Sequence, residues 1–261
     1  PRHHIIIETD GTPDDLRALN MILSSKNTEV LAITSTDGVL EPGEGFMKIQ
    51  ALLNSLGHQG IVTGKGIITK NESSPHRALA RSISWGKEPL SYSQPIDVKE
   101  LLIQVIEQEE APVEVISLGP LTNIANAILM KPSVKQKISR IIWFDQCQPD
   151  IQWSNYGMDC LSADYLLNTQ IPVYRIMAGE TPPAITSSFM EEIKSISSPY
   201  ARSILQSHEH DSISQLMQEN KLWIGNELAA LFLYYPDLFE RQTAYPDTAG
   251  RVMKISKPDS A

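Results

Sequence analysis

Short apolar runs alternate with amphipathic segments along most of the chain. The runs have the length and composition of buried strands, and the segments between them carry apolar residues at helical spacing. Strands are predicted at residues 4–8, 30–34, 60–62, 113–117, 138–144 and 173–176. Helices are predicted at residues 14–24, 45–56, 98–109, 121–130 and 226–234, and a further helix ends at 163–168. These repeated units predict an α/β fold with a mainly parallel, Rossmann-like central sheet and helices on both faces.

Two regions depart from this alternation. Residues 65–93 are polar and rich in turn residues, so we predict a long loop there with one short helix near 78–82. From Ser187 onward the pattern is largely helical, with a polar loop at residues 207–214. No internal repeat, low-complexity tract or convincing linker interrupts the sequence, so residues 1–261 are predicted to form one domain.

Composition and charge narrow the possible partners. The 261 residues can bury a sizeable core, and the two cysteines, Cys147 and Cys160, give neither a disulfide framework nor zinc spacing. The net charge of −9 argues against a nucleic-acid partner, because phosphate backbones call for basic surfaces. No apolar stretch is long enough for a membrane-spanning helix, so no membrane partner is expected. The chain opens at Pro1 without Met, which leaves a cytoplasmic protein and an exported one both open.

Parallel sheets bind ligands beyond the carboxyl ends of their strands. This rule selects the residues just after Glu8, Thr34, Ser117 and Phe144. The first of these places is the richest in chemistry: residues 8–15 read ETDGTPDD, with three aspartates at the end of a buried strand and the start of a helix.

A purely structural interpretation explains part of this acidic segment. Thr12 could cap the helix, Pro13 suits its first turn, and Asp14 and Asp15 would favour the positive end of its dipole. Asp10 is left unexplained by this interpretation. A third carboxylate in one turn adds repulsion unless a proton or a cation such as calcium is bound there.

Haloacid-dehalogenase-like phosphatases offer one comparison, because their first strand ends in D-x-D-G-T. Residues 8–12 match that pattern everywhere except at its first letter, where Glu8 stands in place of the nucleophilic Asp. The additional methylene would displace the attacking oxygen from in-line phosphoryl transfer, so this resemblance is the weaker one.

The same segment resembles the start of the nucleoside hydrolases, D-T-D-P-G-x-D-D, with Glu8 in place of the first Asp. The resemblance implies a nucleoside hydrolase fold, and it implies that Asp10 and Asp15 bind calcium. It further implies that Asp10 takes a proton from the metal-bound water and that Asp14 hydrogen-bonds a ribose hydroxyl.

Two further segments extend the resemblance along the chain. Residues 119–125, GPLTNIA, are similar to a family segment in which the residue before the Gly gives its carbonyl to calcium; here that residue is Leu118. Residues 225–230, GNELAA, resemble the family's H-D-P-L-A, so Asn226 takes the place of the last calcium carboxylate and Gly225 that of the His. An Asn oxygen can ligate calcium with one charge fewer, and Asn226 could alternatively just cap its helix.

The segments that the resemblance assigns to substrate binding match the family less closely than the calcium-binding segments do. The family's F-N-x-x-x-D stretch is matched by residues 153–159, which implies that Asn155 contacts the ribose. Where the family has an Asn after the second strand this chain has Val39, although Asp37 lies close by in sequence. The paired glycines expected after residues 138–144 are replaced by Asp145 and Gln146.

With Gly225 at the His position, the leaving-group acid must come from elsewhere. His208 and His210 are the candidates, because a His has a suitable pKa, and Trp223 could stack on a purine. The alternatives are that both His side chains are solvated and that Trp223 belongs to the core.

The resemblance therefore predicts a calcium-dependent hydrolase of ribonucleosides or related N-ribosyl compounds with a water nucleophile. The alternative is a family member that binds a sugar or polyol without turnover, favoured by Val39, Gly225 and Asn226. Members of the family are commonly dimers or tetramers, so a homo-oligomer is an expectation that rests on the resemblance alone.

Overall fold

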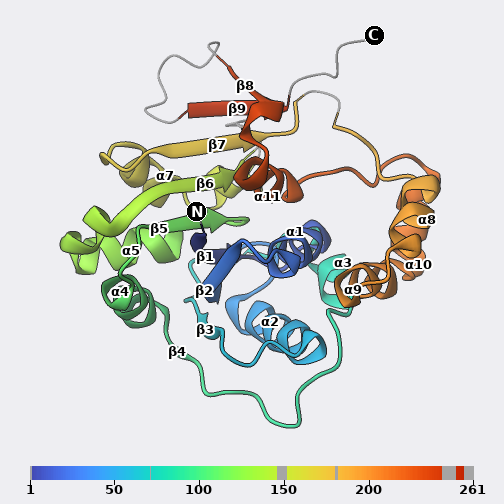
Figure 1. The fold of residues 1–261 in the computed structure, drawn as a ribbon, viewed down its shortest axis with the longest axis horizontal. Coiled ribbons are helices and arrows are strands. Elements are labelled where there is room, and N and C mark those ends of the chain that lie inside the picture. Colours follow the sequence, from blue (N-terminus) through green and yellow to red (C-terminus); the bar gives the residue numbers. More distant parts are fainter. Residues whose placement is uncertain (1, 71, 146–151, 180–181, 243–250, 256–261) are drawn as a thin grey trace.

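The computed structural model describes residues 2–70, 72–145, 152–179, 182–242 and 251–255 (Figure 1). Its centre is a nine-stranded sheet in the order β4-β3-β2-β1-β5-β6-β7-β9-β8, in which every neighbouring pair is parallel except β8 and β9. The strands are β1 (His3–Thr9), β2 (Thr28–Ser35), β3 (Val62–Lys65), β4 (Ile96–Asp97), β5 (Val113–Ser117), β6 (Ile138–Phe144), β7 (Val173–Met177), β8 (Phe239–Arg241) and β9 (Arg251–Ile255).

Helices cover both faces of the sheet, which confirms the predicted fold class (Figure 1). Ile5 and Ile7 of β1 pack with α1, α2 and α11, whereas Ile6 between them packs on the other face with α4, α5 and α7. The helices are α1 (Pro13–Ser24), α2 (Pro42–Leu56), α3 (Arg77–Ser82), α4 (Val98–Gln108), α5 (Thr122–Met130), α6 (Asn155–Met158), α7 (Cys160–Leu167), α8 (Ser187–Ser195), α9 (Pro199–His208), α10 (Asp211–Gln218) and α11 (Glu227–Tyr234), with 3-10 turns at Pro132–Lys137 and Pro236–Leu238.

Two predictions about the elements were wrong. The third strand lies at Val62–Lys65 and not at 60–62, because the chain pairs with β2 through Thr63 and Gly64. The polar loop predicted at 207–214 is mostly helix: α9 runs through His208 and α10 begins at Asp211. The C-terminal part is largely helical, as predicted, with α8 to α11 between Ser187 and Tyr234, and β8 and β9 then extend the sheet.

The sheet order explains where a ligand site can form. β2, β1, β5 and β6 are consecutive in the sheet and parallel, so the loops that follow them lie side by side at one edge. These are the four places that the sequence selected. None of the described helices is both long and apolar enough to cross a membrane.

Candidate functional site

The turn after β1 is organised around the carboxylate of Asp15. Its Oδ2 accepts hydrogen bonds from the Thr9 hydroxyl at 2.5 Å and from the main-chain N–H groups of Asp10 and Gly11 at 3.2 and 3.1 Å. Its Oδ1 accepts from the Thr12 hydroxyl at 2.8 Å. Thr12 occupies the cap position of α1, but its side chain caps no main-chain N–H. Asp15 therefore holds the turn itself, in addition to any role toward a ligand.

Asp10 is buried at the centre of this turn. Its Oδ2 accepts a hydrogen bond from the main-chain N–H of Val39 at 2.8 Å, and its Oδ1 is buried with no hydrogen-bond partner among the described residues. Gly38 allows this approach, because a Cβ there would lie 2.2 Å from Asp10 Oδ2. Burial, with a smaller contribution from the charge of Asp14, raises the pKa of Asp10 to about 6.

Asn226 joins this cluster from α11, more than two hundred residues along the chain. Its main-chain N–H donates to Asp14 Oδ2 at 2.9 Å, and its side-chain Nδ2 donates to Asp15 Oδ1. Its Oδ1 is buried without a partner in the described structure. Burial and the charges of Asp10 and Asp14 raise the pKa of Asp15 well above its ordinary value. Asn226 stands at the start of α11, yet its side chain makes no capping bond to that helix.

The turn that carries Asn226 is held by a buried ion pair that sequence reasoning missed. Arg17 Nε donates to Glu227 Oε1 at 2.6 Å, and Glu227 Oε2 accepts from the main-chain N–H of Gly225 at 2.9 Å. Gly225 suits this place because a Cβ there would lie 2.4 Å from Asp14 Oδ2. The sequence did contain a signal for this ion pair: Arg17 and Glu227 are charged residues on the apolar faces of α1 and α11. No local sequence pattern indicated that the two residues meet.

His208 lies beside the same ion pair and is not solvated. Its Nε2 lies 2.9 Å from Arg17 Nη1 and its Nδ1 lies 2.9 Å from the Ser207 hydroxyl. Burial, reinforced by the charge of Arg17, lowers the pKa of His208 to about 4. The ring is therefore neutral at pH 7, with Nε2 accepting from Arg17, so proton donation to a leaving group would first require Arg17 to move.

The remaining sequence candidates occupy distinct places. Asp37 is buried and its Oδ2 accepts from the N–H and hydroxyl of Thr69 at 2.6 and 2.9 Å and from the N–H of Lys70 at 3.0 Å, so it anchors the long loop. Asn155 Nδ2 donates to the carbonyl of Leu118 at 3.0 Å and to that of Phe144 at 2.8 Å, which ties the ends of β5 and β6 together.

His210 and Trp223 lie further from the carboxylates. The His210 side chain accepts a hydrogen bond from the N–H of Ser212 and caps α10. Trp223 is 51% exposed and donates its indole N–H to the carbonyl of Asn220, so the alternative that it belongs to the core was wrong. Its main-chain carbonyl accepts from Arg17 Nη2 at 3.0 Å, which links it to the ion pair.

Glu8 points away from this site into the core. It is fully buried, and no hydrogen bond with good geometry reaches either carboxylate oxygen within the described structure. Burial raises its pKa to about 8, and the nearby Thr34 hydroxyl and Ile124 N–H offset only part of that rise. A carboxyl group that is fully buried cannot reach a phosphate bound at the strand ends, so the geometry gives the phosphatase alternative no support.

Asp145, found where paired glycines were expected, is buried at the end of β6. Its Oδ2 accepts from Arg175 Nη2 at 2.6 Å, and its Oδ1 accepts from the N–H of Tyr156 at 3.2 Å. The guanidinium of Arg175 lies over the rings of Trp143 and Tyr156, at 5.3 and 5.6 Å from their centroids. The neighbouring Gln146 and Cys147 lie outside the described residues.

The donor set at the end of β1 fits a hard cation. Hard cations take oxygen ligands, and Asp10 and Asn226 each hold a buried side-chain oxygen that no described residue satisfies. Asp15 adds a second carboxylate. Leu118 directly follows β5, the strand next to β1, and its main-chain carbonyl would add a further oxygen. No group of three or more His, Cys, Asp or Glu side chains that could hold a metal occurs among the described residues, so amide and main-chain oxygens would complete the set.

Comparison with known proteins identifies the class of protein. The sequence pattern of the inosine-uridine preferring nucleoside hydrolase family matches residues 5–255, so the chain belongs to this family. It is accordingly an enzyme of the N-glycosyl hydrolase class, acting on the N-glycosidic bond of ribonucleosides.

Individual relatives agree with this assignment. The chain is 27% identical over 263 residues to a pyrimidine-specific ribonucleoside hydrolase RihA of Shewanella baltica strain OS185, with 93% of this chain and 81% of the relative covered. Its fold is that of an inosine-uridine preferring nucleoside hydrolase from Bacillus anthracis, with a TM-score of 0.77 at 18% identity over 98% of this chain and 95% of the other. A plant nucleoside hydrolase, PpNRh1, matches with a TM-score of 0.76 at 19% identity over 100% and 91% of the two chains.

Proposed function

We propose that this enzyme hydrolyses a ribonucleoside with one bound calcium ion and a water nucleophile. The observation that carries the proposal is the unpartnered, buried Oδ1 of Asp10 in a cluster with Asp15 and the unpartnered Oδ1 of Asn226. Asp10, Asp15, Asn226 and the carbonyl of Leu118 would hold the ion. When bound, calcium would offset the carboxylate charges and acidify a water molecule in its shell.

The protein's own groups would supply the remaining steps. Asp10 would accept the proton of the attacking water through its free Oδ1, while the N–H of Val39 holds the other oxygen in place. Asp14 would accept a hydrogen bond from a ribose hydroxyl and help to stabilise the positive charge that develops on the sugar. Asn155 would orient the ribose, and Trp223 is exposed enough to contact the base.

Both candidate leaving-group acids are engaged in hydrogen bonds within the protein. His208 is neutral and its Nε2 is occupied by Arg17, and His210 caps α10, so each would have to leave a bond seen in the structure to donate a proton. One relative is a pyrimidine-specific ribonucleoside hydrolase. Uridine is therefore the first substrate to test.

The test is uridine hydrolysis by wild type and by Asp10→Asn, with calcium and after chelation. We expect Asp10→Asn to lower kcat by about 10²–10⁴-fold, the range for a general base. Asp237→Asn, an exposed carboxylate beyond α11, is the matched control and is expected to keep wild-type activity. Full activity of Asp10→Asn would remove the proposed mechanism.

A second candidate function is sugar or polyol binding without turnover. It is favoured by Gly225, which leaves no side chain at the family's His position, and by Asp37, whose carboxylate oxygen is used to anchor Thr69 and Lys70. Calcium binding by calorimetry together with absence of uridine, cytidine and inosine turnover would support this candidate over the hydrolase.

A further inference from the structure

Two consecutive peptide groups lie between the guanidinium of Arg77 and Asp10. Their N–H groups face Asp10: that of Val39 donates to Oδ2 at 2.8 Å and that of Leu40 to the main-chain carbonyl at 3.0 Å. Their carbonyls face Arg77: that of Val39 accepts from Nε at 2.8 Å and that of Gly38 from Nη2 at 3.5 Å. Both groups are trans, and the C=O and N–H of a trans peptide group point in opposite directions. Arg77 and Asp10 therefore hold the same two groups from opposite sides.

Arg77 is buried, and each of its guanidinium nitrogens has a partner. Only 8% of the residue is exposed, and Nη1 donates to the Ser73 hydroxyl at 3.0 Å and to the Glu41 carboxylate at 3.1 Å. Ala80, one turn further along α3, packs with Val39 in a small apolar cluster. Polar and apolar contacts together thus join α3 to the loop that holds Asp10.

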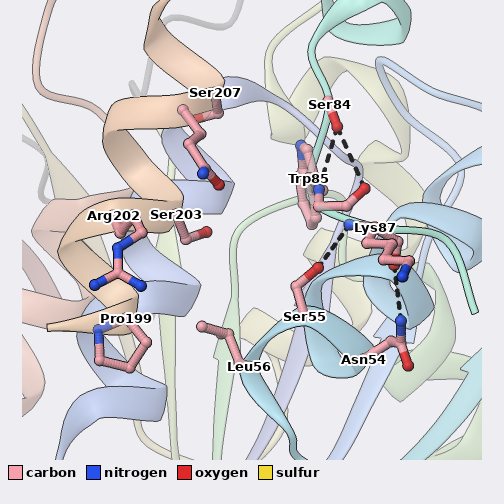
Figure 2. A pocket seen from close by; sticks show the side chains of 12 residues that line it. Asn54, Ser55, Leu56, Ser84, Trp85, Lys87, Pro199, Arg202, Ser203 and Ser207 are labelled. Atoms are coloured by element: carbon pink, nitrogen blue, oxygen red, sulfur yellow. Dashed lines mark hydrogen bonds between the residues drawn. The ribbon is translucent and has the colours of Figure 1, made fainter.

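The helix that carries this guanidinium is itself supported by α2. Lys48 Nζ donates to the carbonyl of Ile83, directly after α3. A little further on, the main-chain N–H of Lys87 donates to the Ser55 hydroxyl at 2.6 Å, and Asn54 Nδ2 donates to the carbonyl of Lys87 at 3.0 Å. Figure 2 shows these last two bonds at one wall of a cavity between α2 and α9. The guanidinium is therefore presented from an element that is fixed at its far end.

The bond from Val39 sets the direction of the Asp10 carboxylate. It fixes Oδ2 and leaves Oδ1 as the buried oxygen without a partner among the described residues. A cation at the carbonyl of a peptide group polarises that group and strengthens its N–H as a donor. The alternative is that Arg77 only satisfies two main-chain carbonyls after β2, in which case it would contribute to stability alone.

We propose that Arg77 is a positioning residue for Asp10, because it holds in place the two peptide groups that orient the Asp10 carboxylate. The functional part of this proposal rests on the proposed role of Asp10 in hydrolysis. The long segment at residues 65–93, which departs from the alternation of strands and helices, would thereby support the site at the end of β1.

The first test is hydrogen exchange of the whole chain in chelator, measured by mass spectrometry on peptides that contain residues 38–41. We expect Arg77→Gln to speed exchange there by roughly tenfold or more, because charged hydrogen bonds that hold the loop are lost. Exchange in β6 should change much less, which separates local loosening from general destabilisation. Arg81→Gln is the matched control and should exchange like wild type, because Arg81 lies on the same helix but is exposed and pairs with Glu44.

The second test is uridine hydrolysis in a double-mutant cycle with Asp10→Asn. Misplacement of a reacting group can cost about 10²-fold, so Arg77→Gln should lower kcat by roughly 10–100-fold. In the Asp10→Asn background the same change should have little further effect, because Arg77 acts through Asp10. A residue that only stabilises the fold would lower activity by the same factor in both backgrounds. Arg81→Gln should keep the wild-type kcat.

The two tests keep this proposal apart from the proposed function. If uridine is not hydrolysed, or if Asp10→Asn is fully active, the proposed function fails, and faster exchange confined to residues 38–41 still supports the hold of Arg77 on the Asp10 loop. Wild-type exchange and kcat in Arg77→Gln would overturn the proposal, and so would equal losses in the two backgrounds. If Arg77→Gln does not fold, Arg77→Lys carries both tests with the same overturning results, because one ammonium group cannot replace the guanidinium at both carbonyls.

Discussion

The ends of β1 and β6 both carry buried carboxylates, but the negative charge is compensated differently at the two ends. After β6, Asp145 is paired with Arg175, and that guanidinium is itself packed over two aromatic rings. After β1, Asp10 and Asp15 lie buried together with no ion pair to a basic side chain among the described residues, and burial raises the pKa of both carboxyls. At the end of β6 the negative charge is neutralised by a side chain of the protein, whereas the carboxylates after β1 need a proton or an external cation.

The difference separates a structural carboxylate from a candidate functional one at the same edge of the sheet. Asp145 has both oxygens satisfied by protein groups, so it has no free acceptor to offer a ligand. Asp10 keeps one buried oxygen unsatisfied, which is a destabilising arrangement unless something binds there. The position of a carboxylate at a strand end is therefore not sufficient to assign a function; its remaining hydrogen-bonding capacity is needed as well.

The largest effect is expected at the β6 end, from Arg175→Met. This change leaves Asp145 buried without its cation, and breaking a buried pair in this way costs about 3–5 kcal/mol of unfolding free energy. Urea denaturation measures the loss. The double variant Arg175→Met with Asp145→Asn should recover much of it, because the uncompensated charge is gone. A single variant as stable as wild type would mean that the pair does not compensate Asp145.

A smaller effect is expected at the β1 end, from Glu8→Gln, and it depends on pH. An unfolded Glu ionises near its ordinary pKa of 4.5, whereas folded Glu8 keeps its proton to about 8. Between these values the folded state binds more protons than the unfolded state, so the unfolding free energy of wild type falls as pH rises. Glu8→Gln removes this contribution, which amounts to a few kcal/mol since one pKa unit is about 1.4 kcal/mol.

The measurement is urea denaturation of both proteins in chelator at pH 5.5 and at pH 8.5. Glu8→Gln should gain stability relative to wild type at the higher pH. Glu110→Gln, which replaces an exposed glutamate, is the control and should follow wild type at both values. Parallel pH profiles for wild type and Glu8→Gln would show that Glu8 ionises normally in the folded protein.

The smallest effect on stability is expected from Asn226→Asp, which adds a negative charge to the cluster of Asp10 and Asp15. Nδ2 of Asn226 donates to Asp15, and an Asp there would replace that bond with repulsion. We expect the metal-free protein to lose about 1–3 kcal/mol of stability and to gain more from added calcium than wild type does. Thermal unfolding with and without calcium measures both. An identical calcium response in the two proteins would argue that position 226 lies outside the metal site.

Local sequence patterns predicted much of the fold and the centre of the site. The turn of residues 8–15 could be located because its apolar strand, glycine, proline and acidic residues all lie within one short segment. The parallel strands bring Leu118 and Asn155 near this turn, and Asn226 at the start of α11 hydrogen-bonds Asp15; their roles toward a ligand stay predictions.

Contacts between residues that lie far apart in the sequence could not be predicted. Arg17 and Glu227 are 210 residues apart, and Asp145 meets Arg175 only because β6 and β7 are neighbours. His208 was expected in a polar loop because its neighbours in sequence are polar, but α9 turns it toward Arg17 and away from solvent. The periodic pattern of apolar and polar residues does not indicate such contacts.

One consequence of the main-chain bond from Val39 concerns how the family can change. The N–H that holds Asp10 is present for every residue except proline at position 39, whereas a side chain at the adjacent Gly38 would collide with Asp10. Position 39 can therefore vary among residues other than proline and still keep the main-chain bond to Asp10, whereas any side chain at position 38 would displace that carboxylate.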